Sequence, residues 1–269
     1  MDAKGALIIA ATGNDSATSI SYPAGYSNNL AVGAVDVNNR HASFSNTGSG
    51  IDIVAPGVLV LSSVPGNPTL SGSEAAVFSS AGTEYRAFGL EFAGKTSGLT
   101  APLIDCGLAT AATDCVNKPA DGYFVALIQR GSISFADKVK NATTAGADAA
   151  ILYNNAAGDF VGTLGTAGTY IPAVSVSDTT GATLKAQVGA RATVKNVASA
   201  WDHMDGTSMA TPHVSGVAAL VWSANPALSD ETVEDYLKTT AQDLGPAGYD
   251  TTYGYGLVNA DAAVAKAGK

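Results

Sequence analysis

The residue pattern with the clearest chemical potential is the run from Gly206 to His213, which reads GTSMATPH. The pattern predicts a helix start in which Thr207 is the N-cap and Ser208 lies in the first turn. Unpaired backbone N–H groups and the positive end of the helix dipole meet there, and both stabilise a developing oxyanion. The run fits a serine nucleophile, and it equally fits an ordinary capped helix.

Apolar patterns before and after this serine predict the strands and helices that would position it. Segments 6–11 and 30–35 are unbroken apolar runs and 51–54 is apolar apart from Asp52, as in strands covered on both faces of a parallel sheet. Residues 207–222 carry apolar side chains at helical spacing, and Ser229 and Asn259 are expected to cap two further helices. The expected fold class is α/β, with a parallel sheet and flanking helices.

The stretch between about residues 66 and 200 differs in composition from the rest of the chain and is rich in Gly, Ala and Thr. Strands are predicted at 123–129, 149–153 and 171–176, together with a helix capped by Ser134. Lys138 and Lys140 are interpreted as solvated charges on that helix. This combination of strands and a helix, in a stretch of different composition, predicts an α+β unit inserted into the α/β domain.

Composition excludes several classes of protein. The 269 residues carry a formal net charge of −9, which argues against nucleic-acid binding because that needs clustered Lys and Arg. No apolar run is long enough to span a membrane. Cys106 and Cys115 have neither Cys-x-x-Cys nor zinc-ligand spacing, which favours a disulfide closing a short loop in an oxidising compartment.

The run at 206–213 resembles the serine motif of the subtilisin-like serine proteases (subtilases, peptidase family S8). Other segments follow in that family's order: AATGN at 10–14, YP at 22–23, AVGAV at 31–35, SFS at 43–45, APG at 55–57 and YGLVNA at 255–260. The resemblance implies that Ser208 forms an acyl-enzyme and that Asn14 supplies a side-chain amide to the oxyanion hole. Without this family resemblance, Asn14 would be interpreted as a turn residue.

The intervening segment resembles a protease-associated domain, on the runs ALIQRG at 126–131, SFADKV at 134–139, AGADAAILYNN at 145–155 and IPAVSV at 171–176. The two resemblances imply subtilase catalytic segments at 1–66 and 200–269, interrupted by a protease-associated domain at 67–199. That domain is expected to shape substrate access or bind protein, and no catalysis is assigned to its residues.

A serine nucleophile needs a histidine base and a carboxylate that orients it, and the family places both before the oxyanion asparagine. No histidine precedes Asn14. His213 lies about 140° around and ~7.5 Å along a helix from Ser208, so it is interpreted as a packed structural residue. His41 and His203 are interpreted as surface loop residues.

We therefore expect the C-terminal part of a larger, secreted (extracellular) serine endopeptidase that is inactive alone. Its expected partners are a protein or peptide substrate and the missing N-terminal part of the protease. No cofactor is expected to be required. Calcium is often structural in the family, but without an Asp-x-Asp-x-Asp-Gly run no metal ligands can be predicted. An alternative stays open, a non-catalytic protein-binding module centred on the protease-associated domain.

Overall fold

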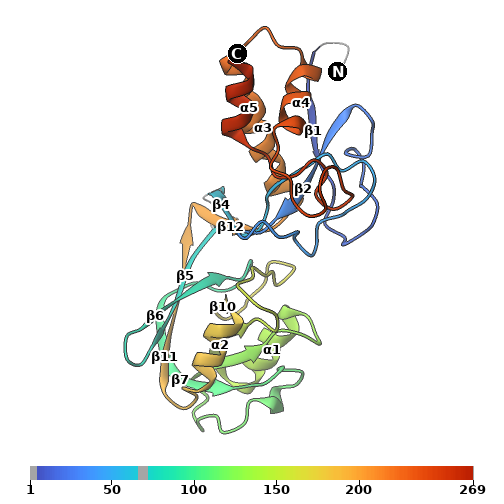
Figure 1. Cartoon of the computed structure of the whole chain (residues 1–269). Helices are drawn as coiled ribbons and strands as arrows, with labels where there is room; N and C mark the ends of the chain where they lie inside the picture. Colours follow the sequence, from blue (N-terminus) through green and yellow to red (C-terminus); the bar gives the residue numbers. More distant parts are fainter. Residues whose placement is uncertain (1–4, 66–71, 269) are drawn as a thin grey trace. The chain divides into compact units, whose positions relative to one another are not determined.

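The computed structural model describes residues 5–65 and 72–268, which fall into two compact units (Figure 1). One unit joins two separate parts of the chain, Met1–Val60 and Met204–Lys269, and the other is Leu61–His203. Among the described residues, no helix combines the length and apolarity needed to cross a membrane.

The first unit is built on a parallel sheet with the strand order β1 (Ile8–Ala11), β2 (Asn29–Val35), β3 (Ile53–Pro56). Its helices are α3 (Thr207–Ala224), α4 (Asp230–Thr239) and α5 (Ala260–Ala267). Helix α3 packs against all three strands and both other helices, so it lies at the centre of this core. Apolar residues of β2 and β3 meet Val214 and Val221 of α3 there. The predicted α/β class with a parallel sheet and flanking helices is confirmed.

The caps predicted for two of these helices are also present. The Ser229 side chain accepts a hydrogen bond from the Thr232 N–H at the start of α4, and the Asn259 side chain accepts one from the Ala262 N–H at the start of α5. Such caps satisfy backbone donors that a helix leaves free.

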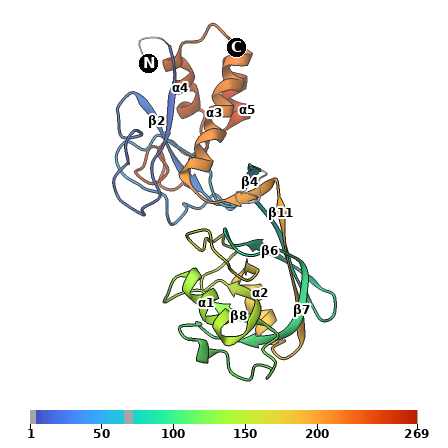
Figure 2. The same cartoon turned by 180° about the vertical axis from the view of Figure 1, so that it is seen from behind.

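The second unit is a closed barrel in the strand order β10-β6-β5-β11-β7-β8-β9. Its strands are β5 (Gly72–Ser79), β6 (Glu84–Gly89), β7 (Thr96–Asp105), β8 (Phe124–Gln129), β9 (Ala147–Tyr153), β10 (Ala173–Val176) and β11 (Arg191–Ser199). A short 3₁₀ helix, η2 (Ala112–Asp114), lies between β7 and β8. Helix α1 (Phe135–Ala145) packs on β9, and α2 (Asp178–Lys185) packs on β8 and β9 (Figure 2).

Two short paired strands carry the chain into and out of this barrel. They are β4 (Val60–Ser63) and β12 (Trp201–Met204), which form a two-stranded sheet. The ladder continues beyond them, because the Val64 N–H donates to the Ala200 carbonyl at 2.9 Å.

The disulfide between Cys106 and Cys115 is confirmed, and its loop is bound to α1 by a lysine. Lys138 is fully buried, so the prediction that it is solvated was wrong. Its Nζ donates to the carbonyl of Leu108 within the disulfide loop, and burial lowers the pKa of this ammonium. Lys140, by contrast, is exposed as predicted.

Candidate active site at the start of helix α3

Ser208 is the second residue of α3, and its side chain is exposed. The N-cap is Gly206, not the predicted Thr207, and no side chain caps the helix. The Gly206 N–H donates to the Gly57 carbonyl at 2.8 Å, which ties the helix start to the loop after β3. The Gly206 carbonyl accepts from Met209 and Ala210 N–H at 3.0 and 3.3 Å.

Asn14 lies in the loop that follows β1, and the structure brings it to this helix start. Its Oδ1 accepts two hydrogen bonds from Thr207, one from the backbone N–H and one from the hydroxyl, both at 2.9 Å. A backbone N–H can only donate, so the amide atom that faces it must be the oxygen. The Thr207 hydroxyl also accepts from the Gly13 N–H at 3.3 Å, and this engagement explains why it does not cap α3.

The two remaining donors of this corner lie within 4 Å of one point beside Gly206, which the Met209 Sδ atom also approaches, to 3.4 Å. A Cβ atom added to Gly206 would lie 3.5 Å from Asn14 Nδ2 and 3.6 Å from the Ser208 backbone nitrogen. The Ser208 N–H finds no acceptor in the described part of the chain, whereas the N–H groups of Thr207, Met209 and Ala210 are all bonded. Two unpaired donors around one point can bind a single oxygen anion.

The histidines of the first unit are engaged elsewhere. His213 is exposed on α3, with Nδ1 2.9 Å from the Met209 carbonyl, so its prediction as a packed residue was wrong. His41, predicted at the surface, is partly buried beside Tyr253, with ring centroids 6.3 Å apart. Burial lowers the pKa of His41, and its Nε2 atom is buried without a hydrogen-bond partner among the described residues.

His203 belongs to the second unit and was also predicted at the surface. Its ring is partly buried and packs edge-on against Phe88 at a centroid distance of 5.0 Å. The backbone N–H of His203 donates to Asp202 Oδ1 at 2.8 Å.

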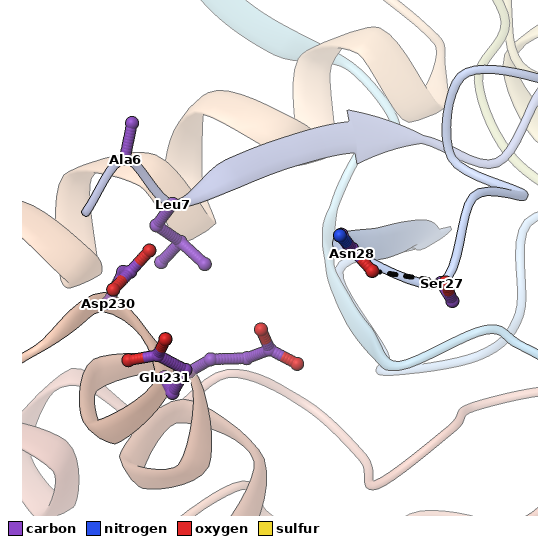
Figure 3. A pocket seen from close by; sticks show the side chains of 7 residues that line it. Ala6, Leu7, Ser27, Asn28, Asp230 and Glu231 are labelled. Atoms are coloured by element: carbon purple, nitrogen blue, oxygen red, sulfur yellow. Dashed lines mark hydrogen bonds between the residues drawn. The ribbon is translucent and has the colours of Figure 1, made fainter. Parts of the chain in front are cut away.

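A cavity of about 230 Å³ lies in the first unit, near the opposite end of β1 from Asn14. Its lining is mainly acidic and polar: Ala6, Leu7, Ser27, Asn28, Asp230, Glu231 and Glu234 (Figure 3). Asp230 and Glu231 come from the first turn of α4, where carboxylates interact favourably with the helix dipole. Within residues 5–65 and 72–268, no three His, Cys, Asp or Glu side chains form a metal-binding group.

Comparison with known proteins gives consistent matches over both units. The model of the subtilase family (peptidase S8) matches residues 1–89 and 124–256. Subtilisin BL of Lederbergia lenta is 61% identical over 64 residues, 24% of this chain and 24% of that protein. Alkaline elastase YaB of Bacillus sp. (strain YaB) is 28% identical over 261 residues, 97% of this chain and 33% of the elastase.

Among solved structures, the psychrophilic subtilisin-like protease Apa1 of Pseudoalteromonas sp. AS-11 matches with a TM-score of 0.66 and 35% identity. The match covers 98% of this chain and 64% of that one. The chain therefore spans less than two thirds of the length of each of these three relatives.

Proposed function

The chain belongs to the subtilase family of serine proteases, and from this membership we propose that Ser208 is the nucleophile of a serine endopeptidase. The observation that carries the proposal is the placement of Asn14 Nδ2 and the Ser208 N–H around one point, 3.5 and 3.6 Å away. A peptide carbonyl oxygen seated near that point would receive both hydrogen bonds as it becomes negative.

In the proposed reaction, Ser208 Oγ attacks the carbonyl carbon of a peptide bond and the carbonyl electron pair moves onto oxygen. Asn14 Nδ2 and the Ser208 N–H donate to that oxyanion. Collapse breaks the C–N bond and leaves an ester on Ser208, which water then hydrolyses. The amide of Asn14 suits this role because it stabilises charge without exchanging protons.

The hydroxyl proton of Ser208 must pass to a base and then to the leaving amine. His213 Nδ1 is bound to a helix carbonyl, and His41 is packed against Tyr253. We therefore propose that the histidine base and its carboxylate come from a polypeptide segment outside these 269 residues. The chain alone then has no peptidase activity.

We propose that the second unit, with its closed barrel, is a protease-associated domain that shapes substrate access or binds protein. The disulfide within it supports an extracellular location, because such bonds persist in oxidising compartments. This unit would also carry the function of the alternative, a non-catalytic protein-binding module.

An active-site-directed fluorophosphonate tests the nucleophile. The chain alone should label no faster than Ser208→Ala. A complex with the N-terminal catalytic segment of a related subtilase, verified by size exclusion, should label at residue 208. Rapid labelling of the isolated chain would refute the proposal that the histidine base lies outside these residues. A complex that assembles but is not labelled would favour the alternative, a non-catalytic protein-binding module.

Two variants of the same complex test the oxyanion hole. Asn14→Ala should lower kcat by roughly 10²–10³ with little change in KM, a range that was measured on a subtilisin and is thus a family expectation. Gly206→Ala keeps both donors and places a methyl group at the point they share. It should also lower kcat, and wild-type turnover in Gly206→Ala would contradict the assigned position.

A further inference from the structure

Asn46 lies in the connection between β2 and β3 and is only 1% exposed. Its Oδ1 accepts hydrogen bonds from the Asp15 N–H at 2.9 Å and the Ala17 N–H at 3.0 Å. Both donors belong to the loop that carries Asn14. A single buried oxygen therefore fixes two backbone groups on the C-terminal side of Asn14.

The amide nitrogen of Asn46 binds the same loop. Nδ2 lies 3.1 Å from the Thr12 carbonyl, 3.2 Å from Ser21 Oγ and 3.3 Å from Asp15 Oδ2. The backbone N–H of Asn46 adds a bond to the Gly13 carbonyl at 2.9 Å. The bonds to the Thr12 and Gly13 carbonyls hold the residues on the N-terminal side of Asn14.

The loop is shaped to admit this side chain. Gly13 has a φ of +105°, and a Cβ atom there would lie 2.4 Å from Asn46 Nδ2 and 2.5 Å from Ser21 Oγ. A distance under 3.0 Å requires a neighbour to move. Only glycine at position 13 therefore lets the Asn46 amide lie directly beneath the backbone next to Asn14.

We infer that Asn46 is a positioning residue for the oxyanion hole, which holds the loop on both sides of Asn14 so that its carboxamide reaches Thr207. No bond joins the side chains of Asn46 and Asn14 in the described structure, so Asn46 acts through the loop. The catalytic part of this inference rests on the proposed function. The geometric part, that Asn46 maintains the bond from Asn14 to the helix start, does not.

Amide hydrogen exchange in the full chain tests the geometric part. The Thr207 N–H reports the bond to Asn14, and the Val54 N–H, which donates to the Gly256 carbonyl at 3.0 Å, reports opening of the whole unit. In Asn46→Ala, exchange at Thr207 should accelerate at least tenfold more than at Val54, because buried groups of the loop lose their partners. Equal acceleration at the two amides would overturn the inference.

Two further variants separate positioning from general stability. Asn259→Ala removes a side-chain acceptor of the same kind, 3.0 Å from the Ala262 N–H, at α5. This variant should accelerate hydrogen exchange at the Thr207 and Val54 amides by the same factor. Asp15→Asn with Asn46→Asp exchanges the amide and the carboxylate of one contact, and this pair should recover part of the protection that Asn46→Asp alone loses.

The labelling rate of Ser208 in the complemented complex tests the catalytic part. Asn46→Ala should slow labelling at least tenfold, while Asn259→Ala should leave it within twofold of wild type. If Asn14→Ala slows labelling and Asn46→Ala does not, the positioning role is overturned. If neither changes the rate while Thr207 exchange responds to Asn46→Ala, the proposed function fails and the geometric inference stands.

Discussion

Gly57 permits a close approach between the sheet and the start of α3, so Gly57→Ala is a direct test of how this corner is built. A Cβ atom at position 57 would lie 2.6 Å from the Ala34 Cβ, 2.7 Å from the Gly206 carbonyl oxygen and 3.3 Å from the Ala210 Cβ. The first two distances require β2 or the helix start to move. Since the Gly206 carbonyl is backbone, no rotamer change relieves the contact.

The expected cost follows from two contributions. Overpacking a dense core costs about 1–3 kcal/mol. Displacement also weakens the bond from the Gly206 N–H to the Gly57 carbonyl, 2.8 Å long, and the bond from the Gly57 N–H to the Val35 carbonyl, 3.0 Å long. Each contributes roughly 0.5–1.5 kcal/mol. We therefore expect Gly57→Ala to lower the unfolding free energy of the first unit by about 2–4 kcal/mol, with partial loss of the two bonds.

Urea unfolding measures this value if the signal comes from the first unit alone. The chain has two tryptophans, and Trp222 lies on α3, with Nε1 2.9 Å from the Leu228 carbonyl. A Trp201→Phe background leaves it as the only tryptophan.

Gly216→Ala is the matched control, because nothing lies within 4 Å of a Cβ at this exposed position of the same helix. It should stabilise the unit by about 0.5–1 kcal/mol through helix propensity. A loss below about 0.5 kcal/mol in Gly57→Ala, which is the usual range of a neutral surface change, would refute the close-approach argument.

Three further predictions concern titration and the disulfide. Burial raises the pKa of the Asp52 carboxyl above its ordinary value of 3.8, so the folded state binds this proton more tightly than the unfolded state does. The stability of wild type relative to Asp52→Asn should therefore fall as pH rises from 3.8 through the raised pKa. A pH-independent difference in urea midpoints would contradict this. Reduction of Cys106–Cys115, which are 9 residues apart, should lower the unfolding free energy of the second unit by about 2.5–3 kcal/mol, and an unchanged circular-dichroism urea transition would argue against it. Burial lowers the pKa of the Lys138 ammonium, so the buried charge destabilises the fold fully below the lowered pKa and progressively less as pH rises toward 10.5. The urea midpoint of wild type should therefore rise over this pH range. The urea midpoint of Lys138→Met should not.

The elements that the sequence predicted well are those set by local patterns. The run at 30–35 falls within β2, and Ser229 and Asn259 cap helices as expected, because a cap needs only backbone groups two or three residues away. Thr207 does not cap α3 as predicted, because its hydroxyl accepts instead from the Gly13 N–H, 194 residues away in sequence. Lys138 was missed because the carbonyl that its ammonium meets lies in a loop 30 residues earlier.

The candidate site divides in the same way. The position of Ser208 in the first turn of a helix follows from Gly206 and the apolar spacing of the residues after it. The approach of Asn14 to that turn is a long-range contact that periodicity cannot predict, and only the family resemblance indicated it. Asn46 had no local signal at all, since a buried asparagine in a connection looks like any turn residue until its partners are known.

The paired strands β4 and β12 have a consequence for how this chain could be rebuilt. Residues 64 and 200 are joined by a hydrogen bond, so the two points at which the barrel is attached are already neighbours. A short hairpin turn could replace the barrel at little entropic cost, because the ends to be joined need not travel. For the same reason, the barrel could be inserted into the turn of another hairpin, whose paired strands have the spacing that residues 64 and 200 already have.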